Sequence, residues 1–171
     1  HEISATLSVR LRVTDAAGLS YERTFTVEVL DVNEAPTGLQ ISRDSVDENV
    51  AVGTVVATLS AEDQDAGDSL TFALVTGAGD SDNAYFEVVG SELHTRAPLD
   101  HEAAATRSVR LRVTDAVGAQ QSRSFTVTVR DLNEGPRDLT LDHDEVAENA
   151  AAGTLVGTLA ATDDGDADTL A

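Results

Sequence analysis

The chain has 171 residues and a formal net charge of −20 at pH 7, and all eleven of its basic residues are arginine. This acidity argues against binding to nucleic acid or to anionic membrane surfaces, because both require basic patches. No apolar run approaches the ~18–20 residues needed to cross a bilayer. No signal peptide opens the sequence, so we expect either a mature internal piece of a longer chain or a recombinant fragment. Cysteine is absent, so a secreted domain would take its rigidity from a core of ~100 residues, from metal ions or from both.

The predicted elements are β-strands, because apolar and polar residues alternate along most of the chain. Near the N-terminus Val9, Leu11 and Val13 share one face, and charged residues occupy the other. This period of two is typical of half-buried antiparallel strands. The seven strands predicted for the middle of the chain are 39–47, 53–61, 70–75, 85–89, 92–95, 107–114 and 123–130.

Seven short strands separated by Gly- and Asp-containing turns predict an all-β fold. With turns every 8–12 residues in a unit of about 100, the expected architecture is an immunoglobulin-like sandwich with Greek-key connections. The Cys and Trp residues that mark true immunoglobulin domains are absent.

The sequence also repeats itself at a spacing of 100 residues. The segment 9–15 returns unchanged at 109–115, and 31–36 returns at 131–136 with two substitutions. A repeat of this length is a whole domain, because helical and propeller repeats have periods of roughly 50 residues or fewer. Pro36 and Pro136 mark the boundaries, since proline ends a hydrogen-bonded ladder. We therefore predict three parts: the C-terminal part of one repeat at 1–36, a complete repeat at 37–136 and the N-terminal part of the next at 137–171.

Acidic residues recur at the edges of each repeat. The groups are Glu48-Asn49 and Glu148-Asn149, Asp100-His101-Glu102, the loop 63–68, the Asp-x-Asn-Glu linkers at 31–34 and 131–134, and the strand-ending Asp15 and Asp115. Ca²⁺ takes 6–8 oxygen ligands, and the two carboxylates of an extended Asp-x-Asp point the same way. Without a cation such a cluster repels itself. Zinc is less favoured, because cysteine is absent and only four histidines occur.

Taken together, these motifs resemble a cadherin repeat. The matching segments are Asp47-Glu48-Asn49, Leu99-Asp100-His101-Glu102, Ala61-Glu62-Asp63-Gln64-Asp65, Val113-Thr114-Asp115 and Asp131-Leu132-Asn133-Glu134-Gly135-Pro136. Each motif alone is weak, but all five in this order at a 100-residue period are specific. The lack of lysine and cysteine, and Glu for Asp in the linker, make the chain more similar to bacterial cadherin-like repeats of large adhesins than to animal cadherins.

The resemblance implies that Ca²⁺ binds at the junctions between repeats. At the first junction the implied ligands are Glu2, Asn33, Glu34, Asp63, Asp65, Asp68 and Asp115. At the second they are Glu48, Asp100, Glu102, Asp131, Asn133 and Glu134, with Asp163 and Asp168 from the next repeat. His101 lies between two of these ligands and is expected to point outward.

On this resemblance we predict a non-enzymatic stalk repeat, stiffened by Ca²⁺, in a large bacterial adhesin that is secreted or held at a cell surface. Its partners would be neighbouring repeats of the same chain, and the partial flanks could complement those of another molecule; neither nucleic acid nor direct membrane contact is expected. Two alternatives remain: a spacer or glycan-binding module of a secreted polysaccharide-degrading enzyme, and a homophilic adhesion domain. Ser, His and Asp occur without a nucleophile elbow, which argues against catalysis.

Overall fold

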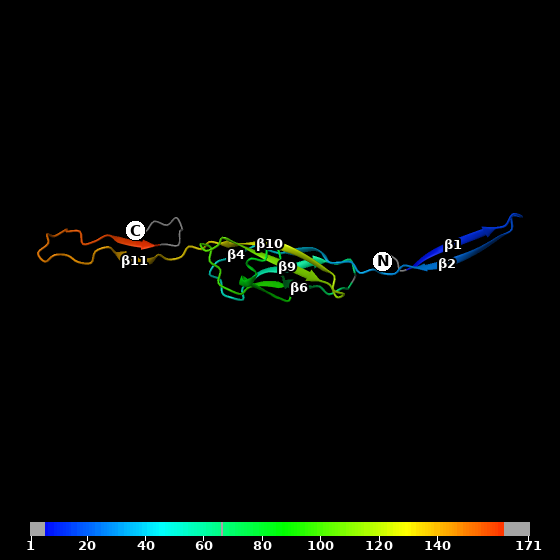
Figure 1. The fold of residues 1–171 in the computed structure, drawn as a ribbon, viewed down its shortest axis with the longest axis horizontal. Helices are drawn as coiled ribbons and strands as arrows, with labels where there is room; N and C mark the ends of the chain where they lie inside the picture. The colour runs from blue at the N-terminus through cyan, green and yellow to red at the C-terminus, as the bar shows by residue number, and fades with distance from the viewer. Residues whose placement is uncertain (1–5, 66, 163–171) are drawn as a thin grey trace.

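The computed structural model describes residues 6–65 and 67–162 and has a β-sandwich at its centre (Figure 1). One sheet has the strand order β4-β10-β9-β6 and the other β3-β5-β8-β7. The strands are β3 (Thr37–Ile41), β4 (Ser45–Asp47), β5 (Val55–Glu62), β6 (Thr71–Leu74), β7 (Phe86–Val89), β8 (Glu92–Thr95), β9 (Thr106–Thr114) and β10 (Gln120–Arg130). The predicted all-β sandwich is confirmed.

The first predicted strand, 39–47, is wrong as a single element. β3 pairs antiparallel with β5, whereas β4 pairs parallel with β10 in the opposite sheet. The side chains explain the break: Leu39 faces the core from an odd position, whereas Val46 faces it from an even one. One strand cannot point both residues inward, because side chains alternate with a period of two. The chain therefore crosses between the sheets near Ser42, whose backbone N–H donates to the Thr58 carbonyl at 2.9 Å.

The core lies between the two sheets and is built mainly from β5, β9 and β10. The buried apolar side chains are Leu39, Val46, Val56, Ala57, Leu59, Phe86, Leu93, Leu99, Val109, Leu111, Val113, Val127 and Val129. Their alternation along β9 and β10 follows the sequence pattern. A short 3₁₀ helix, η1 (Asn83–Tyr85), precedes β7 and was not predicted.

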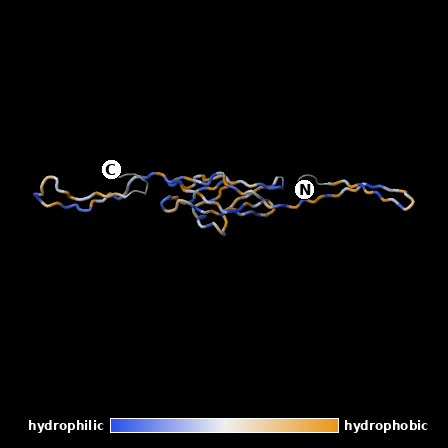
Figure 2. The backbone as a smooth tube through the Cα atoms, turned by 90° about the horizontal axis from the view of Figure 1, so that it is seen from above, coloured by the Kyte–Doolittle hydropathy of each residue, from blue (hydrophilic) through white to orange (hydrophobic). Residues whose placement is uncertain are grey.

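Two hairpins lie outside the sandwich, at opposite ends of it (Figure 1). The first joins β1 (Thr6–Thr14) to β2 (Ser20–Glu28), and the second joins β11 (Arg137–Leu141) to β12 (Leu159–Thr162). Apolar segments run along both hairpins as well as through the sandwich (Figure 2). Within residues 6–65 and 67–162, each hairpin is a two-stranded sheet with no second sheet packed on it.

Candidate metal centres

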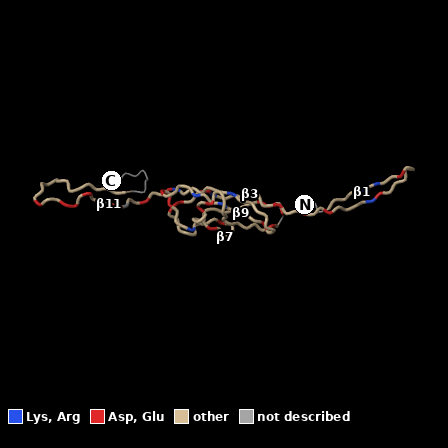
Figure 3. Tube along the Cα trace, in the orientation of Figure 1, with Lys and Arg blue, Asp and Glu red and all other residues tan. Residues whose placement is uncertain are grey.

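Acidic residues gather at the two ends of the sandwich (Figure 3). At the end nearer the first hairpin, carboxylate oxygens of Asp63, Asp68 and Asp115 all lie within 4.8 Å of one another. Asp63 follows β5, Asp68 lies in the loop before β6, and Asp115 follows β9. The end of β9 and the loop between β5 and β6 thus lie together at this end of the sandwich, which is the grouping that the resemblance implies.

Two oxygens of this first group are buried without a hydrogen-bond partner among the described residues: Oδ2 of Asp63 and Oδ2 of Asp68. Buried carboxylate oxygens are costly unless a donor or a cation compensates them. An all-oxygen set of this kind matches the preference of a hard divalent cation such as Ca²⁺. The residues present therefore fit the ion that the sequence implied.

Asp115 is held in place by its own loop and by the linker. Its Oδ1 accepts hydrogen bonds from the backbone N–H groups of Val117 at 2.9 Å and Ala119 at 2.8 Å, and its Oδ2 accepts one from Asn33 Nδ2 at 2.8 Å. The Asn33 amide, and after it the backbone donors of the loop, hold the pKa of Asp115 below its ordinary value against the opposing effect of burial. Asp115 is therefore ionised near neutral pH, as a cation ligand must be.

The first linker is also bonded to the loop that carries Asp63. The Glu34 backbone N–H donates to Asp65 Oδ2 at 3.0 Å, and the Asp65 N–H donates to Asp63 Oδ1 at 3.0 Å. Asn33, Glu34 and Asp65 thus lie beside the three-carboxylate group, while Glu2 lies outside the described residues.

At the other end of the sandwich, Glu48, Asp100 and Glu102 form a second group with oxygens within 4.8 Å of one another. Glu48 follows β4 and is only 1% exposed. Its Oε1 accepts from the Leu132 N–H at 2.7 Å and its Oε2 from the His101 N–H at 2.8 Å. One buried side chain therefore connects the loop before β9 to the linker after β10.

The pKa of Glu102 shows the effect of repulsion between the carboxylates of this second group. Its own backbone N–H lowers the pKa of its carboxyl, but loss of hydration and the nearby charges of Glu48, Asp131 and Asp100 outweigh that effect and raise the pKa overall. Like charges that share a site disfavour each other's ionised forms. A bound cation would remove this penalty, so the second group also fits one.

The expected outward orientation of His101 is wrong. The residue is half-buried, and its Nδ1 lies 2.7 Å from the Val129 carbonyl oxygen, so Nδ1 carries the proton and donates. The Val129 carbonyl, followed by the charges of Asp131, Glu102 and Glu48, raises the pKa of His101 against the effect of desolvation. His101 also groups with Glu102 and Asp131 as a possible ligand set.

The remaining ligands predicted for the second junction are placed differently. Asn133 donates through Nδ2 to the Glu134 carbonyl at 3.0 Å, and the Glu134 carboxylate accepts a hydrogen bond from Asn49. Glu134 joins none of the groups of three carboxylate or histidine side chains within the described part of the chain. Asp163 and Asp168 lie outside the described residues.

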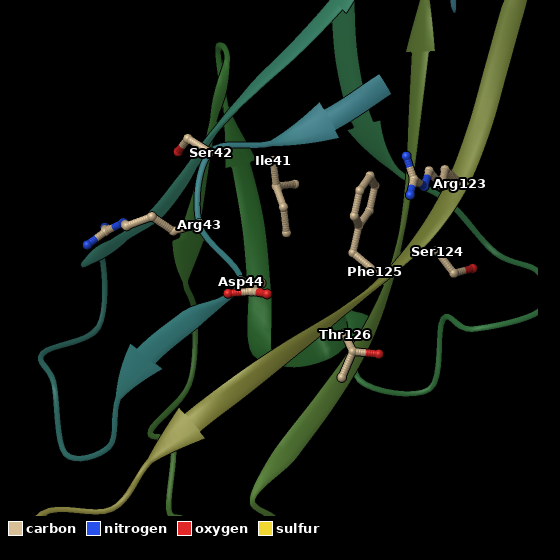
Figure 4. Close-up of a pocket in the computed structure, with 8 residues that line it drawn as sticks. All are labelled: Ile41, Ser42, Arg43, Asp44, Arg123, Ser124, Phe125 and Thr126. Atoms are coloured by element: carbon tan, nitrogen blue, oxygen red, sulfur yellow. The ribbon is translucent and has the colours of Figure 1, made fainter. Parts of the chain in front are cut away.

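A hollow of about 440 Å³ lies where the chain crosses from β3 to β4 (Figure 4). Ile41 and Phe125 lie on facing sides of it, and Arg123 donates to the Leu39 carbonyl at 3.3 Å while its guanidinium stacks 5.1 Å from the Phe125 ring centroid. The hollow follows from the crossing between sheets, and its Arg, Ser and Asp side chains form no nucleophile–base arrangement.

Solved structures with this fold include several multi-domain protocadherin fragments. Extracellular cadherin domains 1–4 of protocadherin gamma B7 match with a TM-score of 0.69 and 22% identity, over 95% of this chain and 42% of that one. The protocadherin gammaB4 extracellular domain matches with a TM-score of 0.63 and 26% identity, over 95% of this chain and 27% of that one. In the described part of the chain, no helix has the length and apolar character to cross a bilayer.

Similar sequences carry cadherin names. Protocadherin Fat 4 of Mus musculus is 33% identical over 147 residues, which is 83% of this chain and 3% of that protein. Cadherin-24 of Homo sapiens is 33% identical over 163 residues, or 85% of this chain and 20% of the relative. The chain thus spans a small part of these relatives. The family model for the cadherin domain matches residues 43–130, about half of the chain, and the chain belongs to the cadherin family.

Proposed function

We propose that the chain is a calcium-stiffened extender of a large adhesin, with a complete repeat at 37–136 between parts of two others at 1–36 and 137–171. Membership of the cadherin family implies a role in adhesion and a non-enzymatic module. The observation that carries the proposal is the position of the carboxylate groups, one at each end of the sandwich beside a linker (Figure 3).

The linkers are bonded to the residues that would hold the ion. Asn33 donates to Asp115 before the sandwich, and Leu132 donates to Glu48 after it. Ca²⁺ held by these carboxylates would cancel their repulsion and restrict the linkers at the same time. Extracellular modules of this type bind Ca²⁺ with Kd ~10⁻⁴–10⁻³ M, which suits a protein outside the cell.

The bacterial source expected from the composition stays a prediction. The relatives named above come from mouse and human, so they support the family and an extracellular setting without supporting a bacterial parent. The number of repeats, the ligand of the adhesin and any homophilic contact belong to the whole parent protein.

Calcium titration tests the proposal. Isothermal calorimetry should detect Ca²⁺ binding that Asp63→Asn and Glu48→Gln each weaken, while Glu87→Gln, an exposed carboxylate on β7, should leave it unchanged. Free Ca²⁺ at about ten times its Kd should add about 1.4 kcal/mol of stability for each site. An equal melting temperature in Ca²⁺ and in EDTA, with no heat of binding, would contradict the calcium mechanism.

A further inference from the structure

The outer face of the sheet formed by β6, β9 and β10 carries a pair of arginines. Arg110 and Arg112 alternate along β9 with buried valine and leucine side chains, so they face away from the core. Along these three strands, which the structure describes completely, no acidic or large apolar residue shares this face. In a chain of net charge −20 the face is therefore a local site of positive charge. Hydroxyl groups surround the two arginines on the same face, at Ser108, Thr114, Ser122, Ser124 and Thr126.

The first hairpin shows what fits between two such arginines. Their counterparts in β1 are Arg10 and Arg12, and Glu22 on β2 is opposite Arg12. The Glu22 carboxylate contacts Arg10, and its other oxygen lies 3.9 Å from Arg12 Nε. In the sandwich the residue opposite Arg112 is Ser122, in the same register. The sandwich thus keeps both arginines and lacks the carboxylate that lies between them in the hairpin.

No other acidic side chain takes that place. Arg107, on the same strand, pairs with an aspartate 3.5 Å away, whereas Arg110 and Arg112 make no ion pair within residues 6–65 and 67–162. Arg112 lies between two small residues, Ala73 on β6 and Ser122 on β10. Its Nε is buried without a hydrogen-bond partner. A buried donor that lacks an acceptor is costly, so the guanidinium of Arg112 is not satisfied by its own neighbours.

Arg110 is held in position by the loop before η1. Its Nη1 donates to the Ala78 carbonyl at 3.0 Å, and Ser124 donates to the same oxygen at 2.6 Å. The side chain of Arg110 also lies against Gly77, where an added Cβ would be 2.9 Å from its Nε. A guanidinium that is already fixed loses less conformational entropy when it binds an anion. Arg110 is therefore prepared for a ligand.

We propose that this face binds an acidic saccharide, with the carboxylate of a uronic acid in the place that Glu22 occupies in the first hairpin. Charge-assisted hydrogen bonds from the two guanidinium groups would hold the carboxylate. The serine and threonine hydroxyls around them can both donate to and accept from sugar hydroxyls. A protein partner fits less well, because this face lacks the aromatic and aliphatic anchors on which protein interfaces depend.

The acidic ends of the sandwich weaken such binding without preventing it. Arg112 precedes Asp115 by three residues, which is about 10 Å along an extended strand. Charges in solvent are largely screened beyond about 8 Å at physiological ionic strength. The carboxylate groups at the two ends (Figure 3) therefore repel a saccharide on this face only weakly.

Nuclear magnetic resonance titration of the ¹⁵N-labelled chain with trigalacturonic acid tests the proposal. EDTA is present throughout, so that Ca²⁺ cannot bridge the saccharide to the acidic ends. Amide shifts should change around Arg112 on β9 and Ser122 on β10. Ser122→Glu restores the carboxylate of the first hairpin and keeps both arginines, so it should weaken binding about tenfold or more. Ser122→Gln, of the same size without the charge, should retain most of the affinity.

Two arginine variants and two other ligands serve as comparisons. Arg112→Gln should abolish the shift changes, whereas Arg43→Gln, which removes one charge from an exposed position near the crossing between the sheets, should leave them unaltered. Maltotriose, a neutral trisaccharide, should bind much more weakly than trigalacturonic acid. A triglutamate peptide, of the same net charge at pH 7, should do so as well, because it lacks the sugar hydroxyls.

Several results would overturn the inference: no shift changes on β9 and β10, equal affinity of Ser122→Glu and wild type, or maltotriose bound as tightly as the acid. Equally tight binding of triglutamate would replace the saccharide with an acidic protein segment as the partner. A dispersed amide spectrum of each variant shows that it is folded. Because the titration excludes Ca²⁺, its outcome is independent of the calcium mechanism.

Discussion

The β1–β2 and β9–β10 hairpins have closely related sequences and different surroundings. The segment 9–15 is identical to 109–115, and both hairpins pair in the same register. Val109, Leu111 and Val113 are nevertheless completely buried, whereas Val9, Leu11 and Val13 are exposed. The alternating pattern thus determines the local pairing, while burial depends on a second sheet supplied by residues far away in the sequence.

The largest effect expected from this comparison comes from matched leucines. Leu111→Ala should lower the free energy of unfolding of the sandwich by about 2–5 kcal/mol, because it removes buried contacts and leaves a cavity. Leu11→Ala, at the same place in the repeat, should change it by less than about 0.5 kcal/mol. Urea unfolding in dilute solution measures both, and equal losses would mean that the first hairpin is packed against the sandwich.

Glu48 and Glu148, which occupy the same place in the repeat, should give the next largest difference in the free energy of unfolding. Glu48→Ala removes the acceptor of two backbone N–H groups and should cost about 1–3 kcal/mol in EDTA, where cation binding plays no part. Glu148→Ala, at an exposed position, should have almost no effect on the sandwich. A Glu48→Ala protein as stable as the wild type would show that these hydrogen bonds contribute little.

Asp82 lies in the middle segment of the sandwich, which neither hairpin repeats. A substitution at Asp82 therefore probes a part of the fold that only the sandwich contains. It accepts from the Ser108 N–H at 2.8 Å, and its Oδ1 lies 3.5 Å from Arg107 Nη1. Partial burial raises the pKa of Asp82, but the Ser108 N–H, the Ser81 hydroxyl and the Arg107 charge together bring it below 3.8. Asp82→Asn should therefore cost about 1–2 kcal/mol at pH 7.

Because the pKa of Asp82 is lower in the folded state, its contribution is complete above the unfolded value of 3.8 and disappears as the pH falls through the native pKa. Unfolding curves of wild type and Asp82→Asn should converge in acid. A difference that stays constant down to about pH 2 would contradict the ionic origin, and Glu87→Gln on the exposed surface of β7 serves as control.

The smallest expected change in stability concerns the β-bulge that β3 in the sandwich and β11 in the second hairpin share. Gly38 has φ 66° in β3, and Asp138 has φ 53° at the corresponding place in β11. This left-handed region suits glycine, and Asp tolerates it better than most residues. Gly38→Asp should cost roughly 1 kcal/mol or less, and Gly38→Ala should cost more, both measured by thermal unfolding. The reciprocal change Asp138→Gly should leave the unfolding of the sandwich unaltered.

Most of the fold could be predicted from the sequence, because alternation is a local signal and the repeat shows the patterns of the first and last thirds of the sandwich twice. The division of 39–47 into β3 and β4 could have been found from the change of parity between Leu39 and Val46. The position of η1 could not, since Asn83–Tyr85 is too short to show a helical period and Asp82 at its N-cap makes no side-chain capping hydrogen bond.

The candidate sites, like the fold, contain some contacts that could be predicted from the sequence and others that could not. The resemblance to cadherin repeats implied that Glu48 would lie near Asp100 and Glu102, and Asp63 and Asp68 near Asp115, and these side chains do lie together. Their role as Ca²⁺ ligands stays a prediction. The contact of His101 with Val129 depends on how the loop before β9 folds back onto β10, and nothing in the residue types specifies that direction.

The parallel pairing of β4 with β10 has a mechanical consequence. β4 lies near the beginning of the sandwich sequence and β10 at its end, and Ser45–Asp47 runs in the same direction as Thr128–Arg130. A tensile force that pulls residue 37 away from residue 130 slides these two strands past each other. The ladder bonds between them are then loaded together in shear instead of being opened one at a time. The crossing of the chain between the sheets thus places a ladder that would be loaded in shear between the two ends of the sandwich.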